Sequence, residues 1–456
     1  MTQHTRWILL LSVLAILARL VFLLAFGGLD ENIHDSMSDQ HMYLDIARNL
    51  AEGRGFSVST ATWIADAGKE TSIVPPLYPL LVALCYKVFG ESLVPVRLLQ
   101  VLLSLIVVIV VYLVGCYVSN QRTGAIAGIA TAIYPALVMY VRPIMSEAIF
   151  FPLVALLGWT TCQLDQDSPP IGLYLVWGLV AGLAILTRTE IVLLVGLLLF
   201  YLIYHQLQKA NTVRFVPFVM LLLTLSLSLF PYALYNYSAH GDFSPLPNAK
   251  WKLWDHTWWA EMRNHSEWQS VSLPERQIVP DWEGLTESER DTYLWSMGIQ
   301  FIYENPGIYF TQRVKRLFWS YPLIPLEEIP PPFGNKVSSA RPDGYQYGPT
   351  SLDDVVRYIT PAEKARVWFF RLVIVLAVGG IICVLFQRQR NAYWLILILF
   401  WNAFHSMVFV GSERLRLQID AFLIVLAAYF LDYLIVSLRT TKRTHHLSRP
   451  GSVRGG

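Results

Sequence analysis

The sequence reads WILLLSVLAILARLVFLLAF at residues 7–26 and SMSDQHMYLDIA at residues 36–47. The first stretch is an apolar run of about 20 residues, the length that an α-helix needs to cross a lipid bilayer. It is longer than the apolar core of a usual signal peptide and lacks a clear cleavage site, so we expect an uncleaved first span. The second stretch is only half apolar, which predicts a helix that lies along the membrane interface.

Similar apolar runs recur along most of the chain. Hydrophobic residues make up 54% of the sequence and charged residues 15%, whereas soluble domains are usually about 25% charged. The sequence therefore predicts an all-α polytopic membrane protein with about ten transmembrane helices. The expected spans, with approximate ends, are 7–27, 93–115, 124–141, 144–163, 171–187, 190–207, 215–234, 367–386, 392–410 and 417–438.

The net charge argues against a nucleic-acid-binding protein, and the cysteine positions argue against a metal site made by cysteines. The formal net charge is +2, which is too small to indicate a nucleic-acid partner. The four cysteines are scattered, mostly within apolar runs, and have no metal-ligand spacing. We therefore expect no nucleic-acid partner and read the cysteines as small packing residues.

Four regions follow from the positions of the spans. Residues 1–234 form an N-terminal transmembrane module, which includes an outer loop at 28–91 with interfacial helices. Residues 235–366 form a long outer loop, rich in Trp, Pro and charge, which we expect to hold a small mixed domain with further interfacial helices. Residues 367–438 supply the C-terminal transmembrane helices, and residues 439–456 form a basic tail.

The basic residues of the short links predict the orientation of the chain. Ten spans place both termini on one side, and the links on that side carry Arg122, Lys209, Arg214, Arg388 and Arg390. The excess of basic residues in such loops marks the cytoplasmic side. We therefore expect a multi-pass protein of the plasma (inner) membrane with cytoplasmic termini and both long loops outside.

The stretch at residues 36–47 has two readings. Asp39 falls in the first turn of the expected helix, where it complements the helix dipole and, with Ser36, forms a variant of a capping box. Asp39 and Tyr43 are one turn apart and share a face of the helix. In the second reading, Asp39 is a carboxylate at the lipid–water boundary that takes part in catalysis.

Other charged residues are expected on the same outer face as Asp39. A cation at the end of a span commonly extends to the lipid head groups. That explanation favours the cytoplasmic side, however, whereas an excess of outer cations beside acidic residues suggests a bound anionic ligand. The residues in question are Asp39, Lys69, Arg97, Glu147, Arg188, Arg414 and Arg416.

This arrangement fits the transfer of a sugar from a polyprenyl phosphate. The leaving phosphate needs cations, and the acceptor hydroxyl needs a base, which an interfacial carboxylate supplies. The sequence also lacks a Gly-rich nucleotide-binding fingerprint. A lipid-linked glycan polymerase or ligase would act on related substrates. A flippase or transporter is a further alternative, but charges at mid-span are scarce here, with Asp420 and Asp432 the closest exceptions.

The chain resembles the GT-C class of lipid-dependent membrane glycosyltransferases, including bacterial relatives of protein O-mannosyltransferases and of lipid A aminoarabinose transferase. The matching pieces occur in order along most of the chain: Asp39–Ala47, Pro75–Leu81, Ser146–Glu147, Gly182–Arg188, Asn305–Pro306 and Arg414–Asp420. The family has Glu after the first Asp, where this chain has Gln40. That difference puts a role for a second carboxylate, such as metal binding, in doubt.

The resemblance implies roles for individual residues. Asp39 would be the base that activates the acceptor, and Glu147 a second acid that holds the acceptor or a cation. The donor phosphate would be bound by Lys69, Arg414 and Arg416, with Arg188 a weaker candidate. Three residues would support the site: Tyr43, His405 and Arg97. Tyr43 would pack beneath Asp39.

The implied reaction is a single displacement with inversion at the sugar. The expected partners are the polyprenyl-phosphate sugar donor, an acceptor glycan, lipid or protein, and membrane lipids. We expect no metal site made by a tight group of residues and no certain cofactor, although a divalent cation is compatible with the outer acids.

Overall fold

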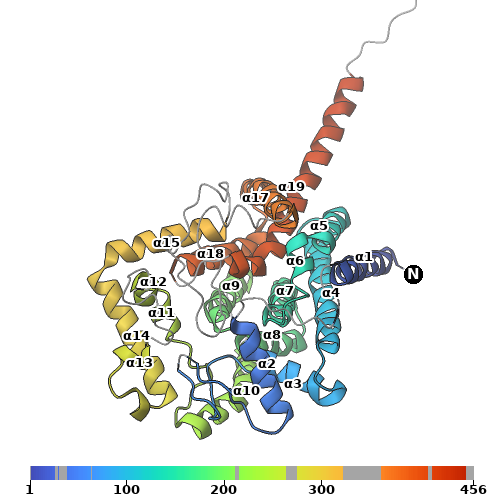
Figure 1. Ribbon diagram of the computed structural model, residues 1–456. Helices are drawn as coiled ribbons and strands as arrows, with labels where there is room; N and C mark the ends of the chain where they lie inside the picture. Colours follow the sequence, from blue (N-terminus) through green and yellow to red (C-terminus); the bar gives the residue numbers. More distant parts are fainter. Residues whose placement is uncertain are drawn as a thin grey trace, which may run out of the picture.

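The fold was examined in a computed structural model, which describes residues 2–25, 29, 38–62, 64–210, 215–262, 275–321, 361–408 and 413–447. These residues are mostly helical, and their only strand-like pairing is an isolated bridge between Ser57 and Glu70. Figure 1 shows α4, α8 and α9 close to α7, with α13 and α14 set apart at one side. The predicted all-α architecture is therefore confirmed.

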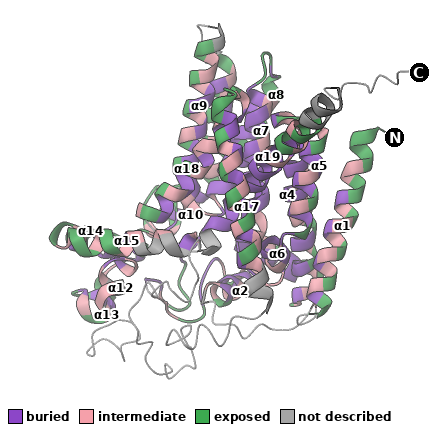
Figure 2. Ribbon diagram, turned by 90° about the horizontal axis from the view of Figure 1, so that it is seen from above, coloured by how far each residue is buried: buried purple, intermediate pink, exposed green. Residues whose placement is uncertain are grey.

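Within the described residues, eight helices are long and apolar enough to cross a membrane. They are α1 (Gln3–Ala25), α4 (Leu93–Val118), α7 (Glu147–Leu164), α9 (Val192–Ala210) with the preceding η1 (Thr189–Ile191), α10 (Phe215–His240), α17 (Pro361–Phe386), α18 (Tyr393–Val408) and α19 (Glu413–Leu447). In Figure 2 the long helices run side by side, and their outward surfaces are the more exposed ones. Exposed apolar surface of this kind is expected where lipid is the solvent.

The two remaining predicted spans are shorter than expected. Residues 124–141 divide into α5 (Gln121–Ile133) and α6 (Pro135–Met139). The division falls at Pro135, which lacks the N–H that a continuous helix would need. The other short helix is α8 (Ile171–Ile185). All ten apolar runs are thus helical, but only eight are long enough to be counted as spans.

Close helix contacts depend on small residues at two crossings. A Cβ atom added at Gly115 of α4 would lie 2.8 Å from Cα of Gly124 in α5. A Cβ atom at Gly178 of α8 would lie 2.3 Å from the carbonyl oxygen of Leu221 in α10. Membrane helices commonly approach each other through such small residues, because dispersion contacts replace the hydrophobic effect in lipid.

The loop between α1 and α4 folds back against the bundle through two short helices. They are α2 (Ser38–Ala51) and α3 (Leu77–Phe89), which pack on one another. The apolar face of α2, with Tyr43, Ile46 and Ala47, is buried as its periodicity predicts. At about 1.5 Å per residue, α3 is only about 20 Å long and is too short to span a bilayer.

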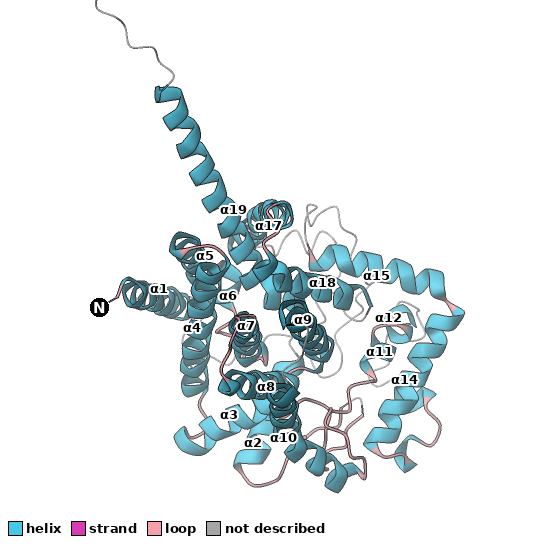
Figure 3. Ribbon diagram, turned by 180° about the vertical axis from the view of Figure 1, so that it is seen from behind, coloured by secondary structure: helices cyan, strands magenta, loops and turns pink. Residues whose placement is uncertain are grey.

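The described part of the long loop is helical rather than mixed. Its helices are α11 (Lys252–Asp255), α12 (Trp258–Met262), α13 (Glu275–Ile278), η3 (Trp282–Gly284), α14 (Glu287–Glu304) and α15 (Pro306–Ser320). Residues 322–360 of this loop lie outside the described residues. In Figure 2, α2, α12 and α13 lie at the same end of the bundle. The last helix, α19, continues to Leu447, past the predicted end at 438, and projects beyond the other helices (Figure 3).

The two outer loops are joined through the first turn of α14. Glu287 accepts hydrogen bonds from the Thr71 hydroxyl at 2.6 Å, the Ser72 amide at 2.8 Å and the Asn248 side chain at 2.8 Å. One turn later, Arg290 donates to Asp66 at 3.0 Å. Since these contacts are largely buried, they fix the first loop and α14 as one unit.

Candidate active site

Arg188 lies between two carboxylates at the end of the bundle that carries α2. Its Nη1 atom donates to Oε1 of Glu147 at 2.7 Å, and its Nε atom donates to Oε1 of Glu190 at 2.5 Å. The side chains are largely buried, with exposed fractions of 14% for Arg188 and Glu190 and 2% for Glu147. Glu147 is in the first turn of α7, where the helix dipole also favours its negative charge. The three charges sum to about −1, a combination suited to a substrate hydroxyl or a further cation.

Two further polar groups act on this cluster. His405 on α18 and Lys252 on α11 lie close enough to Glu190 to interact with it electrostatically. His405 is buried beside Trp401, with the two ring centroids 6.1 Å apart. Lys252 is exposed. The cluster therefore combines residues from α7, the link before α9, α11 and α18.

Helix α2 docks directly on the chain before α7. The hydroxyl of Tyr43 donates to Oγ of Ser146 at 3.2 Å, and Ser146 in turn is 3.5 Å from Glu147 Oε2. The Tyr43 ring packs edge-on against Tyr78 at a centroid distance of 5.2 Å. Asp39 is half-buried and lies one turn before Tyr43, so the two residues are on the same face of α2.

Gln40 anchors the start of α2 through its side-chain amide. Its side chain is 2% exposed, and its Oε1 atom accepts a hydrogen bond from the backbone N–H of Ile144 at 2.9 Å. An uncharged amide can make this bond without burying a charge. Gln40 therefore anchors the first turn of α2, and with it Asp39, on the segment that leads into Glu147.

The predicted phosphate ligands in the loops occupy different surroundings. Lys69 is exposed, and its Nζ atom lies 3.0 Å from Oδ2 of Asp66. Burial alone would raise the pKa of Asp66, but hydrogen bonds from Arg290 and Lys69 outweigh it and lower that pKa below its usual value. The side chain of Arg414 lies outside the described residues. Both residues stay predictions as phosphate ligands.

Arg416 is fully buried in an ion pair of its own. Its Nε atom is 3.1 Å from Oδ1 of Asp420, and its Nη1 atom donates to the Ser320 carbonyl at 3.0 Å. The guanidinium also lies over the ring of Phe370, and Asp420 accepts a 2.6 Å hydrogen bond from Tyr134. These contacts join α15, α17 and α19. The phosphate-binding role of Arg416 stays a prediction, and its surroundings favour a structural role.

Arg97 also makes structural contacts. Its side chain is buried and donates to the carbonyl oxygens of Arg142 at 3.1 Å and Leu29 at 2.6 Å. It thereby ties α4 to the chain before α7 and to the first outer loop. This agrees with a supporting position rather than direct contact with a substrate.

Sequence reasoning did not single out Ser146, Glu190 or Lys252 as site residues. Glu190 is two residues after Arg188, and this spacing could have suggested a pair in an extended link. Lys252 had no such signal, because its position depends on how α11 packs. The flanking Trp251 and Trp254 are buried in the same apolar cluster as Tyr43, which brings α11 to this end of the bundle.

The acids of the cluster are not arranged as a metal site. Among the described residues, no three His, Cys, Asp or Glu side chains gather in a way that could hold a metal ion. The two nearest carboxylates, Glu147 and Glu190, both bind Arg188. A divalent cation therefore stays a prediction, and no step below depends on one.

Part of this chain matches a known protein family. Residues 73–235 match the family described as dolichyl-phosphate-mannose-protein mannosyltransferase. This segment contains Glu147, Arg188 and Glu190 but not Asp39. No curated protein sequence matches the chain.

Solved structures share the overall fold. The archaeal oligosaccharyltransferase AglB from Archaeoglobus fulgidus, solved with an inhibitory peptide and a dolichol-phosphate, has a TM-score of 0.56 and 14% identity, over 99% of this chain and 52% of AglB. The apo form of the Archaeoglobus fulgidus oligosaccharyltransferase has a TM-score of 0.55 and 14% sequence identity, over 98% of this chain and 52% of the oligosaccharyltransferase. ArnT from Cupriavidus metallidurans, bound to undecaprenyl phosphate, has a lower TM-score of 0.40 and 15% sequence identity. This match covers 93% of this chain and 77% of ArnT.

The chain spans about half the length of the oligosaccharyltransferase that it matches. The likeness extends over nearly all of this chain, although few residues are identical. Together, the family match over residues 73–235 and the shared helical fold confirm the resemblance of this chain to the GT-C class of integral-membrane glycosyltransferases.

Proposed function

We propose that this protein transfers a sugar from a polyprenyl-phosphate donor to an extracytoplasmic glycan, lipid or protein. The observation that carries the proposal is the docking of α2 on the Glu147–Arg188–Glu190 cluster through Gln40 and Tyr43. We assign the half-buried carboxylate of Asp39, which is on the same helix as Gln40 and Tyr43, to this site. A donor with a lipid tail can reach such a site from the membrane.

The reaction is a single displacement. The acceptor hydroxyl attacks the anomeric carbon, the bond from that carbon to the phosphate oxygen breaks, and Asp39 takes the hydroxyl proton. Attack opposite the leaving phosphate inverts the anomeric centre. A positioned base of this kind accelerates a reaction by roughly 10²–10⁴-fold.

The remaining charges have separate tasks. Lys252 is exposed beside Glu190 and is suited to contact the donor phosphate, with Lys69 and Arg414 as further candidates from the loops. Arg188 is held by two acids, so we assign it to positioning Glu147 and Glu190, with a weaker role at the phosphate. Glu147 is then placed to accept a hydrogen bond from the acceptor or sugar.

Two comparisons support this assignment. The matched family is named for a dolichyl-phosphate-mannose donor, and the oligosaccharyltransferase of the same fold was solved with a dolichol-phosphate. Both ligands are isoprenoid lipids that carry phosphate. We accordingly propose that the protein lies in the plasma (inner) membrane, with its termini in the cytoplasm and its site outside. We also propose that the chain has four regions, with boundaries after residues 234, 366 and 438.

A direct test uses the purified chain in lipid nanodiscs with a panel of synthetic prenyl-phosphate sugars. We expect release of free prenyl phosphate from one donor, with strong loss in Lys252→Met and partial retention in Lys252→Arg. The exposed Lys87→Met variant, in the last turn of α3, is the control for loss of a cation alone. Turnover of diphosphate donors only would instead indicate a polymerase or ligase. Lipid movement without bond cleavage would indicate a flippase.

A further inference from the structure

Arg19 is a cation buried within a membrane-spanning helix. Its side chain is 0% exposed, and it lies six residues, or about 9 Å, before the described end of α1. Its Nη1 atom donates to the carbonyl oxygens of Ala15 at 3.2 Å and Ala132 at 3.0 Å. Ala132 is at the end of α5, just before the break at Pro135. Arg19 therefore joins α1 to that break.

The rest of the guanidinium has no protein partner. Nε and Nη2 of Arg19 are buried and form no hydrogen bond to the residues that the structure describes. No carboxylate among those residues pairs with Arg19. An arginine keeps its charge in proteins, and an unpaired buried charge is costly. Full burial also excludes the usual solution, in which the side chain extends to the lipid head groups.

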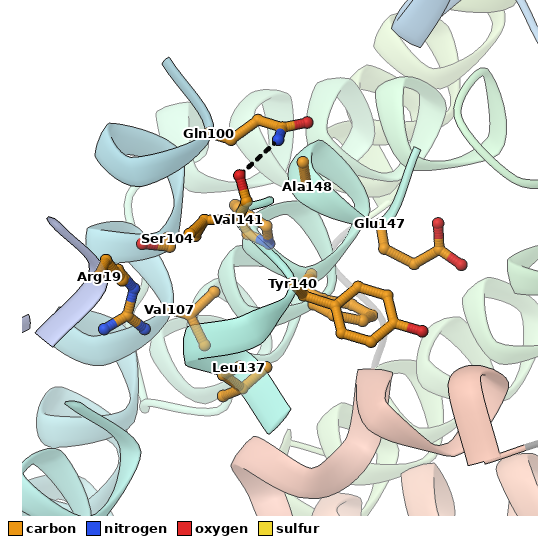
Figure 4. Close-up of a pocket in the computed structure, with 11 residues that line it drawn as sticks. Arg19, Gln100, Ser104, Val107, Leu137, Tyr140, Val141, Glu147 and Ala148 are labelled. Atoms are coloured by element: carbon orange, nitrogen blue, oxygen red, sulfur yellow. Dashed lines mark hydrogen bonds between the residues drawn. The ribbon is translucent and has the colours of Figure 1, made fainter. Parts of the chain in front are cut away.

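A small cavity adjoins Arg19. Its volume is about 20 Å³, and its lining includes Arg19, Ser104, Tyr140 and Glu147. In Figure 4, Arg19 and Glu147 lie on opposite sides, and the carboxylate of Glu147 points away from Arg19. The space takes about one water molecule or one monatomic ion.

The other polar groups of the lining are already engaged. Gln100 donates to the carbonyls of Val141 and Pro143 and accepts from Tyr78. The hydroxyl of Ser104 donates to the Val101 carbonyl at 2.6 Å. Arg19 is thus the cationic residue of a lining that is otherwise largely apolar.

We infer that this cavity binds a small monovalent anion of the size of chloride, held by Nε and Nη2 of Arg19. A phosphate group is too large for the space. The anion neutralises Arg19 and links α1, α4, α6 and α7, all of which line the cavity. Ala148, Phe151 and Pro152 of α7 are part of the lining, so occupancy stabilises the helix start that carries Glu147. This inference stands independently of the proposed function.

The test is the thermal unfolding of the purified full-length chain in nanodiscs at constant ionic strength. Chloride or bromide is titrated against gluconate, which is too large for the cavity. We expect a saturable rise of several degrees in the unfolding temperature with chloride and bromide, and none with inorganic phosphate. Bromide anomalous scattering should place the ion beside Arg19.

Variants separate this site from general salt effects. Arg19→Met and the cavity-filling Ser104→Val should both lose the rise, while Arg6→Met, which removes an exposed cation of the same helix, should keep it. Equal unfolding temperatures of the wild-type chain in chloride and gluconate would mean that water alone fills the cavity. A rise that persists in Arg19→Met and Ser104→Val, or one produced by phosphate, would equally overturn the inference.

Discussion

The Nη1 atom of Arg188 lies 2.7 Å from Oε1 of Glu147, although 41 positions separate the two residues in the chain. The contact joins the start of α7 to the link between α8 and α9. The same guanidinium holds Glu190, so that one cation fixes two acids of the site. Planar guanidinium groups suit such paired contacts, whereas a lysine ammonium presents a single point of charge.

Replacement of Arg188 should therefore damage the site even when charge is kept. We expect Arg188→Lys to lower activity at least tenfold, and Arg188→Met to destabilise the protein by about 3–5 kcal/mol, because it removes the cation that two buried carboxylates share. Arg122→Met is the matched control. It breaks the pair between the half-exposed Arg122 and the buried Asp432, which keeps its hydrogen bonds from Asn120 and Thr123, and it should therefore cost less than Arg188→Met. Thermal unfolding and glycan analysis measure both effects; equal losses in the Arg188→Met and Arg122→Met variants would refute this account.

Gln40 allows a test of how α2 is held. In Gln40→Met the N–H of Ile144 loses its acceptor inside the protein, at a cost of about 1–3 kcal/mol. In Gln40→Glu the acceptor is kept and the residue typical of the family is restored. We expect Gln40→Met to lose both stability and activity and Gln40→Glu to retain most activity. The opposite order would show that the side-chain hydrogen bond does not position α2.

The buried carboxyl group of Asp291 on α14 should make the stability of the folded protein depend on pH. Burial raises the pKa of Asp291 to about 7, partly offset by the backbone N–H of Trp251, compared with about 3.9 in an unfolded chain. Between about pH 4 and pH 7 the folded protein therefore binds the proton more tightly, and its stability falls as pH rises through this range.

Asp291→Asn should remove this dependence. The amide still accepts from Trp251, and it carries no charge at any pH. Relative to wild type, we expect the variant to gain stability from pH 5 to pH 8, by at most about 4 kcal/mol. Thermal unfolding followed by tryptophan fluorescence at each pH checks this, and parallel profiles for the two proteins would contradict it.

Arg416 can be tested as a structural residue against its predicted role at the phosphate. Arg416→Met alone leaves Asp420 buried without its cation and should be strongly destabilising, by about 3–5 kcal/mol. The double variant Arg416→Met with Asp420→Asn removes both charges and should recover much of that stability, with an unchanged KM for the donor. A folded double variant with a greatly raised KM would instead support phosphate binding by Arg416.

Local patterns predicted the helices well, because periodicity and run length act over neighbouring residues. The face of α2 with Tyr43 and Ile46 is buried as predicted, and α3 is short as its length implied. The predicted span at 124–141 is broken at Pro135, and the presence of this proline in the sequence could have been used to predict the break.

The site was predicted less completely, because charge partners depend on packing between distant segments. Arg416 and Asp420 are four residues apart on one helix, a spacing that predicts the observed ion pair. The spacing of Arg188 and Glu190 suggests their contact, whereas Lys252 reaches the site only through the packing of α11, for which no local pattern exists. The described part of the long loop is helical, which its Trp and Pro content did not indicate.

The most direct test of the central claim replaces Asp39 by Asn in cells that otherwise lack the protein, with mass spectrometry of the envelope glycans as the readout. Asp45→Asn is the matched control, since Asp45 is on the same helix but accepts hydrogen bonds from Ser59 in the loop that follows. We predict that Asp39→Asn folds normally and loses glycan transfer by roughly 10²–10⁴-fold, while Asp45→Asn keeps it. Wild-type glycan levels in a normally folded Asp39→Asn protein would contradict the assignment of Asp39 as the base.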